Sequence, residues 1–210
     1  MRRVIVVVAL LAAAALAADN TPPEGFTALF NGKDLTSWGT GVGKEANEKQ
    51  IAEWKVEGGI VKYTGKDGEL WSTKSYKDFV LMVEWRMEKP ADSGIYVRGS
   101  SKCQANIWVN ELGSGEVYGY RTDKNMPEEV QKAATPSKKA DKPLGEWNAF
   151  VITVKGERMT VELNGEKVID NLQMVKCPAE GAIALQNHGQ PLDFKNIYIK
   201  ELKEEAKKAE

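Results

Sequence analysis

"WNAFVITVKGERMTVELNGEKVI", residues 147–169, predicts the fold more clearly than any other stretch of the chain. Apolar and polar residues alternate along it with a period of two, which places them on opposite faces of a β-strand. Turns are expected at Gly156-Glu157 and at Asn164-Gly165, and Asn-Gly between alternating runs is the strongest short signal for a hairpin. This stretch is therefore expected to form consecutive antiparallel strands.

Similar short runs recur along the chain at even spacing, separated by turns rich in Gly, Asn and Asp, and no long helical pattern interrupts them. This organisation is typical of an all-β sandwich or jelly roll, in which two antiparallel sheets each bury one face. The polar residues 121–143 are the exception, and we expect a loop there with a helical turn near Pro127-Glu128-Glu129. The other expected strands lie within residues 25–40, 51–65, 78–88, 93–99, 103–111, 181–189 and 194–202.

The length of 210 residues fits one domain, and the net charge of −1 argues against a nucleic-acid-binding surface. Residues 1–17, "MRRVIVVVALLAAAALA", have the basic start, apolar run and Ala-Leu-Ala site of a secretory signal peptide. Cleavage after Ala17 would give a periplasmic or secreted protein without a membrane span, and the alternative is an uncleaved N-terminal anchor. The expected parts of the mature chain are a linker at 18–24, one sandwich domain at 25–202 and a charged tail at 203–210.

The two cysteines, Cys103 and Cys177, leave two alternatives open. Export would permit a disulfide bond between them. Cys103, however, lies on the apolar face of its expected strand, where an unpaired cysteine behaves as a small hydrophobic residue. The chain has no C-x-x-C motif and no cluster of His and Cys, so a structural zinc site is not expected.

The strand expected in "CQANIWVNE", residues 103–111, has an amide-rich face. One set of alternating side chains, from Cys103 to Val109, is small and apolar. A face that meets only solvent usually carries Lys, Glu and Thr, whereas the opposite face here carries three carboxamides and an indole. These four side chains belong to Gln104, Asn106, Trp108 and Asn110.

Three other expected strands also pair an apolar face with a polar one. If these strands are neighbours, their polar faces form one trough. Amide and guanidinium groups there could bind sugar hydroxyls, and an aromatic ring could pack on the C–H face of a pyranose. The alternative is the ordinary solvated outer face of an antiparallel sheet. The polar residues of these strands are Glu84 with Arg86, Tyr96 with Arg98, and Gln186 with His188.

His188 is the single histidine of the chain and lies near the end of its expected strand. Histidine titrates near neutral pH and is the commonest general base, so His188 is a candidate catalytic residue. The alternative is a surface or structurally hydrogen-bonded histidine. The glycine-rich "GSGEVYG", residues 113–119, lacks the G-K-[ST] ending of a phosphate-binding loop and is expected to be a plain loop.

Several segments taken together resemble the 3-keto-disaccharide hydrolase family over residues 25–202. The resemblance implies a concanavalin A-like jelly roll and an exported bacterial protein that acts on 3-keto-glycosides. The segments are "GFTALFNGKDLTSW", "WKVEGGIV", "LWSTKSYKDFVLMVEWRM", "SGIYVRG", "GEWNAFVITVKGERMTVELNGEKV" and "GAIALQNHGQPLDFKNIYIKEL".

The implied reaction begins at a ketone on C3, which acidifies the C2 proton. A base removes that proton, the enolate is stabilised, the C1 substituent leaves, and water adds. The candidates are His188 as base, Arg98 as enolate stabiliser and Glu84 as acid or positioning group. A divalent metal could act as Lewis acid, but the sequence shows no convincing ligand set, so no cofactor is expected. The expected sugar-binding residues are Gln104, Asn106, Trp108, Asn110, Tyr96, Arg86 and Gln186.

The chain departs from the family pattern in the amide-rich strand. Gln104 stands where Glu is usual, Asn106 where Gln is usual, and Val109 where Asp is usual. The loss of two carboxylates leaves three hypotheses: a 3-keto-glycoside hydrolase or lyase, a non-catalytic carbohydrate-binding module on the same fold, or a secreted structural or interaction domain. A classical glycosidase would need a pair of carboxylates, such as Glu84 and Glu111, at a set distance from each other. This fourth alternative is disfavoured.

Overall fold

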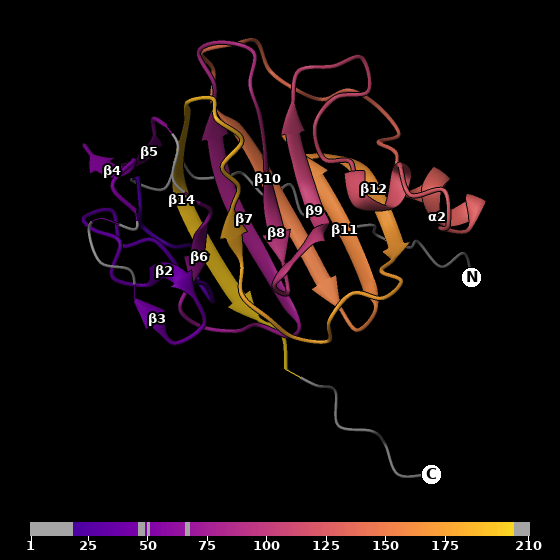
Figure 1. Ribbon diagram of the computed structural model, residues 1–210, viewed down its shortest axis with the longest axis horizontal. Coiled ribbons are helices and arrows are strands. Elements are labelled where there is room, and N and C mark those ends of the chain that lie inside the picture. The colour runs from indigo at the N-terminus through magenta and orange to yellow at the C-terminus, as the bar shows by residue number, and fades with distance from the viewer. Residues whose placement is uncertain (1–18, 46–48, 50, 66–67, 204–210) are drawn as a thin grey trace, which may run out of the picture.

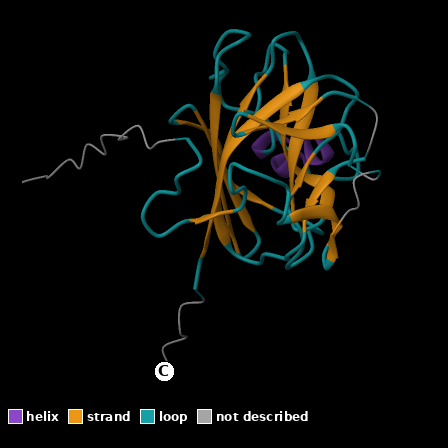
Figure 2. Cartoon of the chain, turned by 90° about the vertical axis from the view of Figure 1, so that its left-hand side faces the viewer, coloured by secondary structure: helices purple, strands orange, loops and turns teal. Residues whose placement is uncertain are grey.

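Two antiparallel sheets contain all the strands of the computed structural model, which describes residues 19–45, 49, 51–65 and 68–203 (Figure 1). Figure 2 shows these strands from the side, together with two short helices. The arrangement confirms the predicted all-β sandwich. The expected signal peptide, residues 1–17, and residues 204–210 of the expected tail lie outside the described residues.

The larger sheet is built around the stretch that indicated the fold. The three strands within residues 148–173 form the expected pair of hairpins, and the turn between the second and third has positive φ at both Asn164 (54°) and Gly165 (82°). Positive φ at both positions is what a two-residue turn of type I′ requires. The strand order is β12 (Glu166–Gln173), β11 (Arg158–Leu163), β10 (Asn148–Lys155), β7 (Phe79–Arg86), β14 (Leu192–Glu201), β5 (Ile60–Tyr63) and β4 (Trp54–Glu57), and β1 (Thr27–Ala28) also pairs with β14.

The smaller sheet contains the amide-rich strand at its edge. In its hairpin of β8 (Asp92–Val97) and β9 (Ser100–Trp108), Tyr96 lies opposite Gln104 and Asp92 lies opposite Trp108. Opposed residues in an antiparallel pair project from the same face, so this register places the four side chains together. The strand order is β3 (Lys44–Glu45), β2 (Trp38–Gly41), β6 (Leu70–Ser72), β13 (Ala184–Leu185), β8 (Asp92–Val97) and β9 (Ser100–Trp108).

The core lies between the inner faces of the two sheets, as the alternation predicted. Alternate residues of β7, from Phe79 to Trp85, and of β9, from Cys103 to Ile107, are buried in it. Each fully buried side chain of this kind stabilises the fold by about 1.5–3 kcal/mol. Val109 was expected on the same buried face but is 51% exposed, because β9 ends one residue earlier.

The chain between β9 and β10 contains two short helices, α1 (Tyr118–Arg121) and α2 (Glu128–Ala133). Helix α2 confirms the helical turn expected near Pro127, and its two N-terminal glutamates suit the positive end of the helix dipole. Helix α1 was not predicted. It lies against β9, with Gly119 so close to Lys102 that an added Cβ would be 2.7 Å from the Lys102 Cα. In the described part of the chain, neither helix is long and apolar enough to cross a membrane.

Candidate functional site

A cavity of about 430 Å³ lies on the outer face of the smaller sheet, between β8, β9, α1 and the segment after β13. Residues from four separate parts of the sequence meet there because α1 folds back on β9 and β13 pairs with β8. Six residues that the sequence singled out line it: Tyr96, Gln104, Asn106, Trp108, Gln186 and His188. The structure adds Asp92, Ser101, Lys102, Tyr118 and Gly119.

Two glutamine side chains form the floor of this cavity by lying over Gly94. A Cβ on Gly94 would come within 2.3 Å of Gln104 Oε1 and 3.1 Å of Gln186 Oε1. Both oxygens are buried and have no hydrogen-bond partner. Both side chains line the cavity, where an amide group can accept and donate hydrogen bonds with a ligand.

Aromatic rings form the walls. Trp108 and Tyr118 meet edge to face with 6.1 Å between their ring centroids. The ring centroid of Tyr96 lies 5.8 Å from that of Trp71. Burial raises the pKa of Tyr96 far above its usual value, so its hydroxyl remains a neutral donor. Such a combination of flat rings and amide donors fits the two kinds of surface that a pyranose presents.

A buried ion pair supports one of these walls. Glu116 is completely buried, and its carboxylate accepts from Arg121 Nε. The Arg121 guanidinium in turn lies 5.7 Å from the centre of the Tyr118 ring. The glycine-rich segment 113–119, expected to be a plain loop, therefore supplies a charged support for the cavity. A glutamate in a polar loop gives no sequence signal for such burial.

His188 and Asp92 lie together at one end of the cavity. Their Nδ1 and Oδ2 atoms are 3.9 Å apart, and the His188 side chain is 53% exposed. Burial raises the pKa of Asp92, and the positive charge of a protonated His188 lowers it in part. With Nδ1 toward the carboxylate, Nε2 is the atom free to exchange a proton with a ligand. Asp92 was not among the site residues expected from the sequence, and this pairing was not predicted.

The expectation that Arg98 shares the polar face of Tyr96 is wrong. Arg98 lies in the turn after β8 with a φ of 52°, so the alternation of the strand no longer applies to it. Its side chain is 3% exposed, donates from Nη2 to Asp78 Oδ1 over 2.9 Å, and donates from Nε to the Lys77 carbonyl oxygen. Arg98 therefore has a structural role away from the cavity.

The expectation that Glu84 and Arg86 join the same trough is also wrong. Both side chains project from β7, which pairs with β10 and β14 in the larger sheet and has no neighbour in the smaller one. Glu84 accepts from Asn196 Nδ2 at 2.9 Å, and Arg86 pairs with Asp193 at 2.6 Å. The alternation within β7 was predicted correctly, but a single strand does not show to which sheet it belongs.

Asn110 is a further residue that the structure does not bring into the cavity. It follows the end of β9, and its Oδ1 atom accepts from the Gly113 backbone N–H at 2.7 Å. Asn110 thus stabilises a turn. Glu111, considered in a carboxylate pair with Glu84, follows β9 in the smaller sheet, whereas Glu84 belongs to the larger one.

The two cysteines are free thiols that lie next to each other. A hydrogen bond with Cys177 lowers the pKa of the Cys103 thiol to about 6, although burial opposes this. The Cys103 sulfur also lies 3.4 Å from the Tyr120 hydroxyl. Within the described residues, no group of three or more His, Cys, Asp or Glu side chains could hold a metal ion.

Comparison with known proteins agrees with this architecture. Residues 25–200 match the profile of the 3-keto-alpha-glucoside-1,2-lyase-like domain. A protein of Bacteroides thetaiotaomicron named 3-keto-disaccharide hydrolase is 25% identical over 233 residues, which cover 85% of this chain and 79% of that protein.

Two solved structures show the same fold. A crystal structure from Parabacteroides distasonis, assigned as a glycosyl hydrolase, has a TM-score of 0.66 at 23% identity and covers 89% of this chain and 100% of that one. The carbohydrate-binding module CBM66 of Bacillus subtilis has a TM-score of 0.51 at 16% identity, covering 79% and 96%. These likenesses agree with the jelly-roll sandwich.

Proposed function

We propose, on the premise that this chain belongs to the 3-keto-alpha-glucoside-1,2-lyase-like domain family, that it cleaves the glycosidic bond of 3-keto-glycosides. The relative named 3-keto-disaccharide hydrolase supports an activity on glycosides. The observation that carries the proposal is the meeting of unpartnered amides, aromatic walls and the His188–Asp92 pair in one cavity.

The cavity would hold the keto-sugar ring between Trp108 and the amide floor. Gln104 and Gln186 would donate hydrogen bonds to its oxygen atoms, and the indole would cover its C–H face. Donors directed at the C3 oxygen would also stabilise the negative charge that develops there when the C2 proton is removed. In this proposal the amide floor stabilises the enolate, which is the role that was expected of Arg98.

His188 would remove the C2 proton through Nε2. The electron pair of the C2–H bond forms the enolate, and its return expels the C1 oxygen substituent and leaves a C1–C2 double bond conjugated to the ketone. The departing oxygen takes the proton from the imidazolium. Addition of water across the double bond, hydroxide to C1 and proton to C2, completes a net hydrolysis.

Asp92 would position His188. Its carboxylate faces Nδ1, so it favours the tautomer in which Nε2 is unprotonated. In this role Asp92 acts through the histidine and does not touch the sugar.

A non-catalytic carbohydrate-binding module remains the second candidate. It is favoured by Gln104, an amide where the family pattern has a carboxylate, because an amide binds a sugar hydroxyl but does not transfer protons. Product formation from a 3-keto-glucoside, measured with wild type and His188→Ala, distinguishes the two candidates. An enzyme loses about 10²–10⁴-fold in turnover with sugar affinity retained, whereas a binding module shows saturable binding and no turnover in either form.

Export by residues 1–17 is part of the proposal, because a glycoside-cleaving protein with this N-terminus would meet its substrate outside the cytoplasm. N-terminal sequencing of protein from the periplasm and the medium tests it. The expected mature N-terminus is Ala18, and an intact Met1 in the membrane fraction would show the uncleaved anchor instead.

A further inference from the structure

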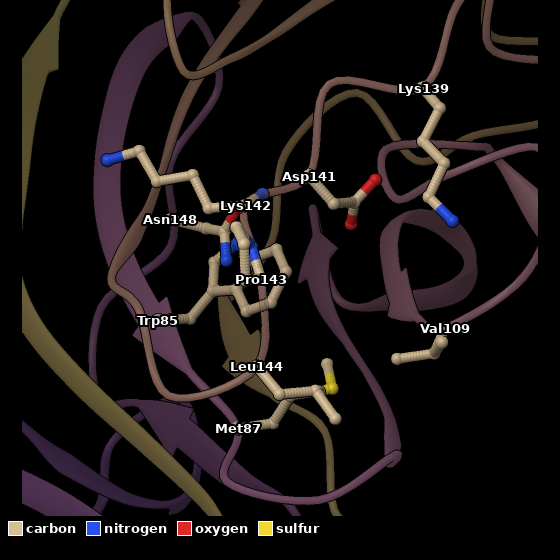
Figure 3. A pocket seen from close by; sticks show the side chains of 9 residues that line it. All are labelled: Trp85, Met87, Val109, Lys139, Asp141, Lys142, Pro143, Leu144 and Asn148. Carbon is tan, nitrogen blue, oxygen red and sulfur yellow. The ribbon is translucent and has the colours of Figure 1, made fainter.

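A second cavity, of about 360 Å³, opens at the end of the sandwich where β7 and β9 finish. Figure 3 shows Trp85, Met87 and Leu144 on one side of it and Val109 across from them. These residues come from the inner face of the larger sheet, from the end of the smaller sheet and from the loop before β10. The cavity is therefore separate from the amide-lined one.

The polar side chains of this second cavity are hydrogen-bonded within the protein, except the indole nitrogen of Trp85, which is buried without a partner. Asp141 accepts from the Ser114 backbone N–H at 3.0 Å, and Asn148 Oδ1 accepts from the Lys142 N–H at 2.8 Å. The surface left for a ligand is apolar. Two of its aliphatic side chains are unusually open to solvent, Val109 at 51% and Leu144 at 46%. An apolar ligand would remove this surface from water.

A shallow depression of about 260 Å³ borders both cavities around the end of β9. It shares Trp108, Asp92 and His188 with the amide-lined cavity and Val109 with the apolar one. His188 therefore stands between a polar, amide-lined compartment and an apolar one. A molecule lying across His188 would place a sugar on one side and an apolar group on the other.

We infer that the apolar cavity binds the aglycone of the substrate, and that this aglycone is aromatic. The inference rests on the proposed function, because it takes His188 as the group at the bond to be cleaved. The exposed aliphatic side chains of Val109 and Leu144 line this cavity together with the Trp85 ring and the Met87 thioether, which are 1% and 4% exposed, and this apolar lining is suited to a planar apolar ring. The aglycone leaves when the C1–O bond breaks, so its binding also selects the substrate.

Two 3-keto-glucosides whose leaving alcohols have similar acidity, methyl and 2-naphthylmethyl, test the inference in wild type, Leu144→Asp and Val42→Asp. Val42 is a matched control, since it is an aliphatic residue that is 51% exposed in the turn between β2 and β3. We expect wild type to prefer the naphthylmethyl substrate by about tenfold or more in kcat/KM, since even one apolar group in a fitted pocket changes selectivity this much. Leu144→Asp should abolish most of the preference, and Val42→Asp should keep it.

Titration with 2-naphthol provides a second measurement that does not depend on turnover. In protein carrying ¹³C-methyl methionine, the Met87 resonance, assigned with Met87→Leu, should shift in wild type and not in Leu144→Asp. A naphthol-induced shift without turnover of either glycoside would support the aromatic site and overturn the proposed function. Equal turnover of both glycosides with no shift would overturn the aromatic site and leave the proposed function intact.

Discussion

The outer faces of the two sheets carry polar side chains that alternate along their strands in the same way, yet the partners of these side chains differ. On the larger sheet, Glu84 and Arg86 are bonded to neighbours in β14. On the smaller sheet, the amide oxygens of Gln104 and Gln186 have no partner, and the face is hollowed into a cavity. Buried polar groups in proteins are normally hydrogen-bonded, so groups left unpaired in a cavity indicate a place for a ligand.

The tryptophans of the two faces show the same difference. Trp147 on the larger sheet is covered by cations, with Arg86 at 4.7 Å and Lys195 at 4.6 Å from its ring centre. Trp108 on the smaller sheet lies edge to face with Tyr118, and its indole nitrogen has no hydrogen-bond partner. A ring already covered by the protein serves stability, whereas a ring at a cavity wall can pack against a ligand.

The largest expected effect is on the stability of the fold and comes from Arg98, whose side chain has a structural role. Arg98→Ala should lower the free energy of unfolding by about 3–5 kcal/mol, because it leaves the Asp78 carboxylate without its buried partner. Chemical denaturation measures this change, and activity per folded molecule should remain. Arg86→Ala, at a partly exposed pair, is the control and should cost about 1 kcal/mol or less. A stable Arg98→Ala protein without activity would show that Arg98 takes part in the reaction.

The second effect is on sugar binding and compares the two tryptophans directly. Trp108→Ala should weaken binding of a keto-sugar by about 1–3 kcal/mol, roughly 5- to 150-fold, because the sugar loses an apolar surface that it covers. Trp147→Ala should leave the affinity unchanged. Isothermal titration of both variants tests this difference, and equal losses in the two would remove the distinction between the faces.

A smaller effect is expected from a methyl group added under the amide floor. Gly94→Ala would place a Cβ 2.3 Å from Gln104 Oε1, so the glutamine must move and sugar affinity should fall several-fold, about 1 kcal/mol for one misplaced hydrogen bond. Gly65→Ala is a matched control, since its Cβ would lie 2.3 Å from Glu53 Oε2, near the larger sheet. Affinity measurements should separate the two variants. An unchanged Gly94→Ala affinity would show that the floor does not bind the sugar.

The smallest effect is a pH dependence carried by Asp92. Burial raises its pKa in the folded state above the unfolded value, so the folded state favours the protonated form. Stability from this group is therefore present at low pH and is lost as pH rises through the folded pKa. Asp92→Asn should reduce this acid-side dependence in denaturation curves recorded between about pH 3 and 7. An unchanged pH profile would contradict the raised pKa.

Much of the smaller sheet's polar face could be predicted from sequence, because a period of two is a local property of a strand. Gln104, Asn106 and Trp108 alternate within β9, and Tyr96 faces the same side through the hairpin register. The chain turn at Arg98 and the early end of β9 could not be predicted, because a change of backbone direction cancels the alternation. Arg98 and Asn110 were assigned to the wrong surface for that reason.

The assignment of strands to sheets depends on contacts between distant parts of the chain. Glu84 was placed in the trough, as acid or positioning group, because β7 has the same alternation as β9, but β7 pairs with β10 and β14. Asp92 and Tyr118 were missed for the opposite reason. Each lies at the end of an element, where no periodic pattern marks it, and only folding brings it to the cavity.

The exchange of the C2 proton tests the central claim most directly. A 3-keto-glucoside is incubated in D₂O with wild type or His188→Ala, and deuterium at C2 of the product is measured by NMR against a sample without protein. The account predicts deuterium at C2 and rapid product formation with wild type, and neither above background with His188→Ala. Product that retains its C2 proton, or equal exchange in both proteins, would contradict a cavity that uses His188 as its base.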